Sequence, residues 1–513
     1  MTDTDHLRTD HLGTDLAVRS ARGSVVTLVA QATKFVAGTA TTVVLARLLG
    51  PDDFGLMAIT LATVGILGRI KDAGLFTATV QSKLLVQEQV TALFWLSTAL
   101  AAAVALLTLM LAPAVGWFYR DARLVPVAAA LACVPLLDGV TMPFQAVMTR
   151  QMRFVALSVL DAGALVVGLG AAVALARAGA GYWSLVWQEI LYSAVYALAI
   201  GIVCRWRPGR PRRPSGVRPM VAFGLHLSGV RILNYLAMNL DTVFVGRFNG
   251  PQQAGIYDRS YRLITLPSTL LNQPLSAVAV PALSRLQDDD TRYRAFYRAW
   301  VGLVFGLTMP LVVFLFVDAE RAVVTILGSQ WIGIVPIYRV LAPAAFIGRF
   351  NVVTNWLYIS TGRADRQLRW SAFVLVTMVT AYAVGVNWGA FGVAAAHTLV
   401  TCTLWYPGVV YCCRTAPVRP GDVLGVMAMP AVASIGAGLG LMAATRVLPD
   451  GLGVPVRFAL DLMVYAALYG AAWVAVPGGR RRLVEFIGIA REAMARPPRP
   501  PAAASQDGSP VDR

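Results

Sequence analysis

The chain has few groups that could carry enzymatic chemistry. Only 14% of its 513 residues are charged, and its three lysines follow Thr33, Ile70 and Ser82. A phosphate-binding loop of the Walker type ends in Gly-Lys, so none of the three can belong to one. The four histidines include no i, i+4 pair and the five cysteines no C-x-x-C. We therefore expect no metal site, no cofactor and no enzyme activity.

The acidic residues are also sparse, and their densest run is Asp288 to Asp290. Three adjacent carboxylates resemble the metal-binding group of a sugar-nucleotide transferase. Such a site needs a nucleotide-binding domain around it, whereas this loop has only about 15 residues. A solvated charge run is the simpler interpretation.

Apolar residues, in contrast, make up 57% of the chain, and the mean hydropathy is +0.63. A water-soluble core of normal proportions cannot bury so much apolar surface, so we expect an all-α integral membrane protein. About fourteen stretches are long enough to cross roughly 30 Å of hydrocarbon as transmembrane helices. They lie near residues 24–46, 54–70, 90–112, 124–148, 154–176, 182–204, 221–246, 257–283, 299–317, 332–359, 370–387, 391–413, 422–445 and 456–477.

Basic residues predict which side each connection faces, because Lys and Arg stay on the cytoplasmic side during insertion. With the amino terminus inside, cytoplasmic loops and tails carry about three times as many Lys and Arg residues as the outward loops. We therefore expect a multi-pass protein of the cell inner or plasma membrane with both termini in the cytoplasm. A basic face that meets anionic lipid headgroups also accounts for the net charge of +17 without any nucleic acid.

Polar stretches divide the chain into segments. The first of them lacks the apolar core of a cleavable signal, so the first span itself should direct insertion. We expect a disordered tail (1–23), a first helical lobe (24–204), an Arg/Pro-rich linker (205–220), a second lobe (221–413), a last helix pair (422–477), a basic amphipathic segment (480–496) and a disordered tail (497–513).

A motif at the end of the first span recurs 200 residues later. Residues 44–57 read VLARLLGPDDFGLM and residues 244–257 read FVGRFNGPQQAGIY. Their shared positions are Arg47, Gly50, Pro51 and Gly55 in the first copy and Arg247, Gly250, Pro251 and Gly255 in the second. Gly and Pro end one helix and begin the next, so both copies predict structural turns between spans. Duplication within a membrane protein is typical of transporters.

Polar residues inside the spans are the candidates for a transport path, because an ionisable group in hydrocarbon costs roughly 2.5 to 3.5 kcal/mol. The 200-residue offset places Gln31 over Arg231 and Lys34 over Asn234, so we expect both helices to line a central, water-filled cleft. The candidates for the substrate cavity are Gln31, Lys34, Arg231, Asn234, Tyr235, Arg349 and Asn355. The candidates for ion coupling are Asp138, Asp161 and Asp241.

Structural roles compete with these assignments. Polar side chains often join membrane helices by hydrogen bonds without touching a substrate. Arg231 and Asp161 could likewise form a salt bridge within the protein.

Longer runs of sequence resemble a known family. They are ARLLGPDDFGLMAI after the first span, RQMRFVALSVLDAGA entering the fifth, and FGLHLSGVRILNYLAMNLDTVFVGRFNGPQQAGIYDRSYRLITLP across the seventh and eighth. They are similar to the polysaccharide transporter family, the Wzx-type flippases of the MATE-like multidrug/oligosaccharidyl-lipid/polysaccharide (MOP) superfamily. The resemblance implies a V-shaped pair of six-helix lobes, related by a pseudo-twofold axis, plus two carboxyl-terminal helices.

The implied task is to move an undecaprenyl-pyrophosphate-linked oligosaccharide from the cytoplasmic to the outer leaflet by alternating access. The implied partners are this lipid-linked substrate and, in the cell, a polysaccharide polymerase and a chain-length regulator. Lipid II flipping, export of small molecules of the MATE type, and a membrane polymerase or ligase are the alternatives. Lys34 and Arg231 in the cleft favour an anionic cargo over small drugs, and the short external loops disfavour a polymerase.

Overall fold

The chain forms helices throughout the residues that the structure describes. The computed structural model describes residues 38–71, 76, 87–210, 218–348, 350–446, 453–475 and 479, and only the backbone at 69–71, 218–234, 267–274 and 277. The helices are α2 (Pro51–Lys71), α4 (Gln87–Tyr119), α5 (Leu124–Leu131), α6 (Cys133–Arg150), α7 (Phe154–Arg177), α8 (Trp183–Val203), α9 (Arg218–Arg285), α10 (Asp290–Val317), α11 (Ala319–Ile326), α12 (Ile334–Gly348), α13 (Phe350–Ser360), α14 (Ala364–Gly385), α15 (Gly389–Cys413), α16 (Pro420–Ala444) and α17 (Val454–Ala475). Gln31, Lys34, Arg349 and the predicted terminal segments lie outside the described residues.

Nine stretches of the described chain are long and apolar enough to cross a membrane. One of them, residues 124–150, contains both α5 and α6, and another, residues 364–413, contains both α14 and α15. Helix α9 covers the predicted seventh and eighth spans, and the backbone leaves the helical conformation at Gly250, where φ is 82°. A positive φ suits glycine because it has no Cβ. The second copy of the repeated motif thus divides α9 into two arms.

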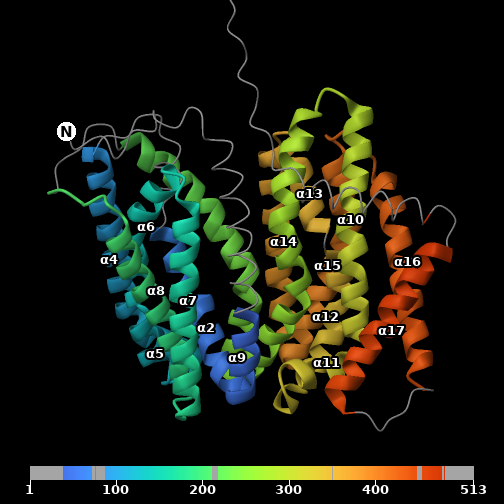
Figure 1. Ribbon diagram of the computed structural model, residues 1–513, viewed down its shortest axis with the longest axis horizontal. Coiled ribbons are helices and arrows are strands. Elements are labelled where there is room, and N and C mark those ends of the chain that lie inside the picture. The colour runs from blue at the N-terminus through green and yellow to red at the C-terminus, as the bar shows by residue number, and fades with distance from the viewer. Residues whose placement is uncertain are drawn as a thin grey trace, which may run out of the picture.

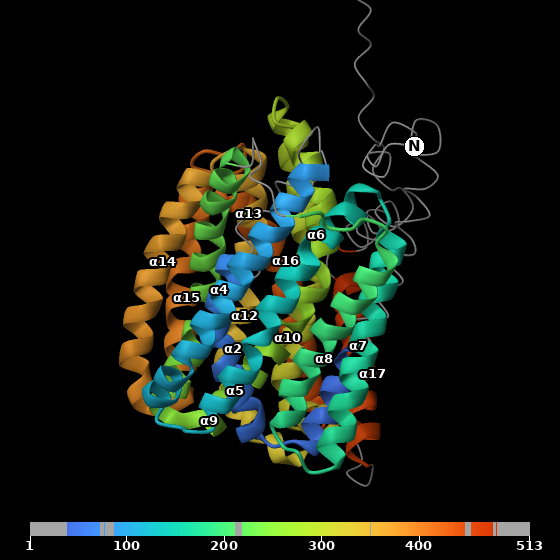
Figure 2. The same ribbon diagram turned by 90° about the vertical axis from the view of Figure 1, so that its left-hand side faces the viewer.

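The helices form two groups with α2 and α9 between them (Figure 1). Helices α4 to α8 make up the first group and α10 to α17 the second, and the long helices run roughly in one direction (Figure 2). Helix α2 packs along α9, and a buried apolar cluster that includes Phe54, Ile59, Tyr257 and Trp331 joins the two groups. The motif copies therefore lie at the junction of the groups.

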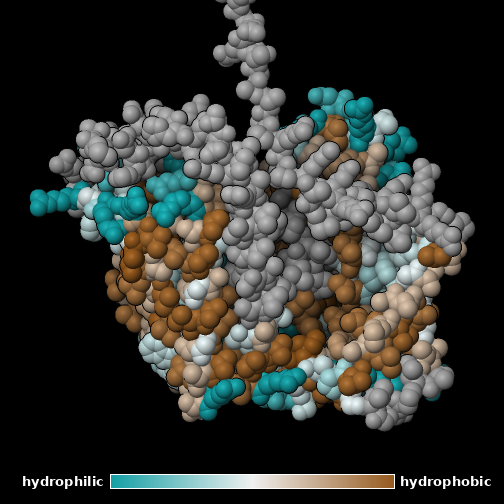
Figure 3. All heavy atoms as spheres, viewed as in Figure 1, coloured by the Kyte–Doolittle hydropathy of each residue, from teal (hydrophilic) through white to brown (hydrophobic). Residues whose placement is uncertain are grey.

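The outer surface of the helices is apolar. Met110, Trp117 and Ile202 are exposed by 71%, 81% and 76%, respectively. Hydrophobic residues cover much of the flank of the molecule, and hydrophilic residues gather near its upper and lower rims (Figure 3). Side chains of this kind face outward when the surrounding solvent is lipid.

Candidate functional site

An arginine-rich turn of α9 lies at the junction of the two groups. Arg262 donates from Nε to both carboxylate oxygens of Asp258, at 3.0 and 2.8 Å, one helical turn away. Nη2 of Arg259 lies 3.2 Å from the same carboxylate, so Asp258 holds two guanidinium groups. The Arg259 guanidinium also packs over the ring of Phe54 in α2, 4.3 Å from its centroid. With two guanidinium groups and one carboxylate, this turn carries a net positive charge.

Arg262 is the most exposed residue of this cluster. Its side chain is 58% exposed, whereas those of Asp258 and Arg259 are exposed by 12% and 14%. Its charge acts on Glu189 of α8, which belongs to the first group. A half-exposed guanidinium between two helix groups offers planar donors that match carboxylate or phosphate oxygens.

The first group contributes a cluster of acidic and tyrosine side chains. Tyr192 of α8 donates a hydrogen bond of 2.6 Å to Oδ1 of Asp161 in α7, and its ring stacks on Tyr196. Asp138 of α6 interacts electrostatically with Glu189. Two of the predicted ion-coupling carboxylates, Asp138 and Asp161, therefore lie within the same group of helices.

Asp241, the third predicted ion-coupling carboxylate, is buried in α9. It accepts hydrogen bonds from the Tyr257 hydroxyl at 2.9 Å and from the Thr242 amide at 2.7 Å. Tyr257 stacks on Tyr261, which meets the ring of His397 in α15 edge to face. These contacts connect Asp241 through Tyr257 and Tyr261 to His397.

The predicted cavity residues do not all meet. Tyr235 donates from its hydroxyl to the Leu61 carbonyl of α2 at 2.5 Å, so it bridges α9 and α2. Asn355 of α13 accepts from Gln367 of α14 at 2.8 Å, a contact inside the second group. Arg231 and Asn234 lie in α9, at positions where only the backbone is described.

Sequence reasoning missed Arg259, Arg262 and their partners Asp258 and Glu189. Asp258, Arg259 and Arg262 stand at the predicted start of the eighth span, where a charged residue is easily assigned to the adjoining loop. The spacing of Asp258 and Arg262, i and i+4 at the start of an apolar helix, is the signal that could have found them. Glu189 is linked to Arg262 only by the tertiary arrangement.

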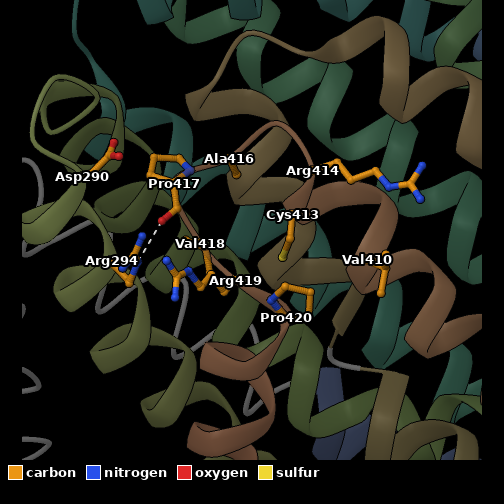
Figure 4. Close-up of a pocket in the computed structure, with 10 residues that line it drawn as sticks. All are labelled: Asp290, Arg294, Val410, Cys413, Arg414, Ala416, Pro417, Val418, Arg419 and Pro420. Atoms are coloured by element: carbon orange, nitrogen blue, oxygen red, sulfur yellow. Dashed lines mark hydrogen bonds between the residues drawn. The ribbon is translucent and has the colours of Figure 1, made fainter.

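A separate pocket lies at the end of the second group where α10 begins and α15 ends. Its volume is 330 Å³, and Asp290, Arg294 and Arg419 are among its lining residues (Figure 4). Arg294 donates to the Pro417 carbonyl at 2.9 Å and lies 3.5 Å from Asp422, so its charge is already paired. This pocket lies at the start of α10. Thr325, which contacts Arg47 near the α2 and α9 junction, follows the other end of α10, so the pocket and this part of the junction are far apart.

Sequence comparison connects the chain to proteins of polysaccharide assembly. Residues 44–336 match the family model described as polysaccharide biosynthesis protein. The lipopolysaccharide biosynthesis protein WzxC of Escherichia coli K12 is 26% identical over 364 residues, covering 70% of this chain and 73% of WzxC. The succinoglycan biosynthesis transport protein ExoT of Rhizobium meliloti 1021 is 27% identical over 308 residues, covering 58% of this chain and 60% of ExoT. Less than two thirds of the length of ExoT is therefore matched.

Solved structures share the fold at low sequence identity. The lipid II flippase MurJ in an inward closed conformation has a TM-score of 0.67 and 12% identity, covering 92% of this chain and 100% of that one. A multidrug resistance MATE family transporter of the MOP superfamily, in an inward-facing conformation, has a TM-score of 0.60 and 15% identity. The likeness covers 74% of this chain and 95% of that one. At these identities the likeness concerns the fold.

Proposed function

Because the chain belongs to the polysaccharide biosynthesis protein family, as a Wzx-type member of the MOP superfamily, we propose that it moves undecaprenyl-pyrophosphate-linked oligosaccharides. It is a membrane transporter and not an enzyme. In the proposed reaction the glycan and pyrophosphate cross from the cytoplasmic to the outer leaflet by alternating access, while the lipid tail stays in the bilayer. The product is a lipid-linked unit ready for polysaccharide assembly.

The observation that carries the proposal is the placement of Arg262. A charge inside a membrane protein is expensive unless a partner or a wet cavity stabilises it. Arg262 has Asp258 on one side and remains 58% exposed at the junction of the groups. A pyrophosphate is the part of the proposed cargo that such a guanidinium would recognise. Arg231 and Lys34 are proposed to add to this basic path.

The finer architecture is part of the same proposal. We infer fourteen spans, with the first at residues 24–46, arranged as two pseudo-twofold lobes of six helices and a carboxyl-terminal pair. We infer cytoplasmic termini and a cytoplasmic linker at 205–220 from the distribution of basic residues. In that orientation the turns at Gly50 and Gly250 face outward.

Energy for transport is proposed to come from an ion gradient through Asp241. This carboxylate is 3% exposed and bonded to Tyr257, so its charge state would affect how the two arms of α9 pack. Asp138 and Asp161 are the corresponding candidates in the first group. Asp241→Asn should uncouple transport from the gradient while the cargo still binds.

The test in cells measures exposure of the lipid-linked glycan on the outer leaflet. Arg262→Gln, Lys34→Ala and Arg231→Ala should each reduce it while protein level and membrane insertion stay normal. Arg369→Gln is the matched control, because its side chain is 74% exposed on α14 and pairs with Asp365. Undiminished exposure in the Arg262 variant would contradict the binding role. Accumulation of the peptidoglycan precursor instead of the exopolysaccharide unit would identify lipid II as the cargo.

A further inference from the structure

The two copies of the repeated motif meet each other in the structure. A Cβ added to Gly55 of α2 would overlap the carbonyl oxygen of Pro251 in α9, and a Cβ added to Gly255 would overlap the carbonyl oxygen of Pro51. The same two Cβ positions lie 3.0 and 2.9 Å from the backbone nitrogen of the opposite glycine. The contact is therefore reciprocal, and only glycine lets the two backbones approach so closely.

The arginines of the motif extend this reciprocity. Arg47 donates from Nη2 to the Thr325 carbonyl of α11 at 2.5 Å, so the first copy reaches the second helix group. Arg247 of the second copy places its guanidinium 5.4 Å from the ring centroid of Phe118 in α4, in the first group. Each arginine thus contacts the opposite group near the end of a long helix: Arg47 reaches α11, which follows α10, and Arg247 reaches the last turn of α4.

Further contacts close this end of the junction. Trp331 donates from Nε1 to the Ala46 carbonyl at 2.7 Å, and Gln330 donates to the same carbonyl at 2.5 Å. The Trp331 ring also packs edge to face against Phe54, with centroids 5.4 Å apart. Backbone contact at the glycines and the aromatic rings beside them therefore join the described parts of the two groups tightly at this end.

We propose that the repeated Arg-Gly-Pro-Gly motif is a reciprocal clasp that holds the two helix groups together on the outer side and separates when cargo is released there. The proposal rests on alternating access as the proposed function. The central contact is between backbones, and the surrounding side-chain contacts of Arg47, Arg247 and Trp331 must break when the groups part. Arg47, Gly55, Arg247 and Gly255 are then positioning residues for transport, in addition to forming turns.

The experiment measures how fast the closed junction becomes accessible from outside. Ile59→Cys, in a background with the five native cysteines replaced by Ser, places a thiol one turn deeper than Gly55, where Ile59 is fully buried beside Gly246. A membrane-impermeant maleimide is applied to right-side-out vesicles. Gly55→Ala or Gly255→Ala should raise the labelling rate about tenfold or more, because the added methyl group disfavours the closed state.

Gly68→Ala is the control on the same helix, since no atom lies within 4 Å of its added Cβ. It should leave the labelling rate unchanged. An unchanged rate in folded Gly55→Ala and Gly255→Ala, or a rise seen only from the cytoplasmic side, would overturn the clasp. If the alanine variants do not fold, the double variant Arg47→Ala/Arg247→Ala adds no clash and must show the rise. The assay uses no cargo, so a failure of oligosaccharide transport would contradict the proposed function and leave the clasp standing.

Discussion

Asp461→Ala should strongly destabilise the attachment of the last helix pair, α16 and α17. Asp461 is fully buried, and its two oxygens accept from Nε of Arg457 at 3.2 and 3.3 Å. Arg321 of α11 donates to Asp461 at 3.0 Å and to Asp318 at 2.8 Å. The carboxylate therefore connects α17 to α11 through Arg321, whereas Arg457 lies one turn away on the same helix as Asp461.

The cost follows from the burial of Arg457, which is only 4% exposed. Removing one partner of a buried ion pair typically costs about 3 to 5 kcal/mol, because the remaining charge is left without compensation. Arg457 keeps a contact to the Thr445 carbonyl at 3.3 Å, which points to the lower half of this range. Asp365→Ala removes an exposed i, i+4 pair with Arg369 and should cost about 0.5 kcal/mol or less.

The assay is equilibrium unfolding in mixed detergent micelles, with the free energy of unfolding compared among Asp461→Ala, Asp365→Ala and the parent. The double variant Asp461→Ala/Arg457→Met should recover most of the loss, since an apolar pair no longer leaves a charge buried. Equal losses in Asp461→Ala and Asp365→Ala would show that the buried charge pair is not responsible. A double variant that is no more stable than Asp461→Ala would show the same.

Two further substitutions test the α2 and α9 junction by the same unfolding measurement. Gly65→Ala should cost about 1 to 3 kcal/mol, because its Cβ would overlap the Tyr235 hydroxyl, whereas Gly68→Ala has open space and should cost far less. Similar losses in both would argue against the close approach. Tyr257→Phe should cost about 1 to 3 kcal/mol by removing a hydrogen bond to the buried carboxylate of Asp241. If the loss keeps its full size in the Asp241→Leu background, where the acceptor is gone, the hydroxyl acts elsewhere.

The sequence predicts the helices and the repeat well because both depend on local chemistry. Apolar runs indicate the nine membrane-length stretches found in the described chain, and the backbone leaves the helical conformation at Gly250, where the Gly-Pro pair indicates a turn. The repeat also predicts that Pro51 and Pro251 are equivalent positions, although not that each would meet the glycine of the other copy. The contacts of Gly55 with Pro251 and of Gly255 with Pro51 depend on how α2 packs along α9, which no local pattern encodes.

Cavity residues are harder to predict than spans, because a polar residue within a span can either line a cavity or join two helices. Asn355 accepts a hydrogen bond from Gln367 of the neighbouring helix, which is the helix-joining role that competes with a role in the cavity. Arg262 was missed because it stands near a predicted helix boundary, yet it faces the junction and is half exposed. Only the packing of α9 against the first group distinguishes an inward arginine from one at the membrane surface.

Transport of a lipid-linked oligosaccharide by the purified protein is the decisive measurement for the proposed function. Proteoliposomes would carry a fluorescent undecaprenyl-pyrophosphate-linked oligosaccharide in one leaflet, and its arrival in the other would be followed by quenching with an impermeant reagent. The protein should move the glycan faster than protein-free liposomes under an imposed ion gradient, and Arg262→Gln should slow it about tenfold or more, as loss of a charge-assisted contact requires. Glycan movement at the protein-free rate would contradict the account.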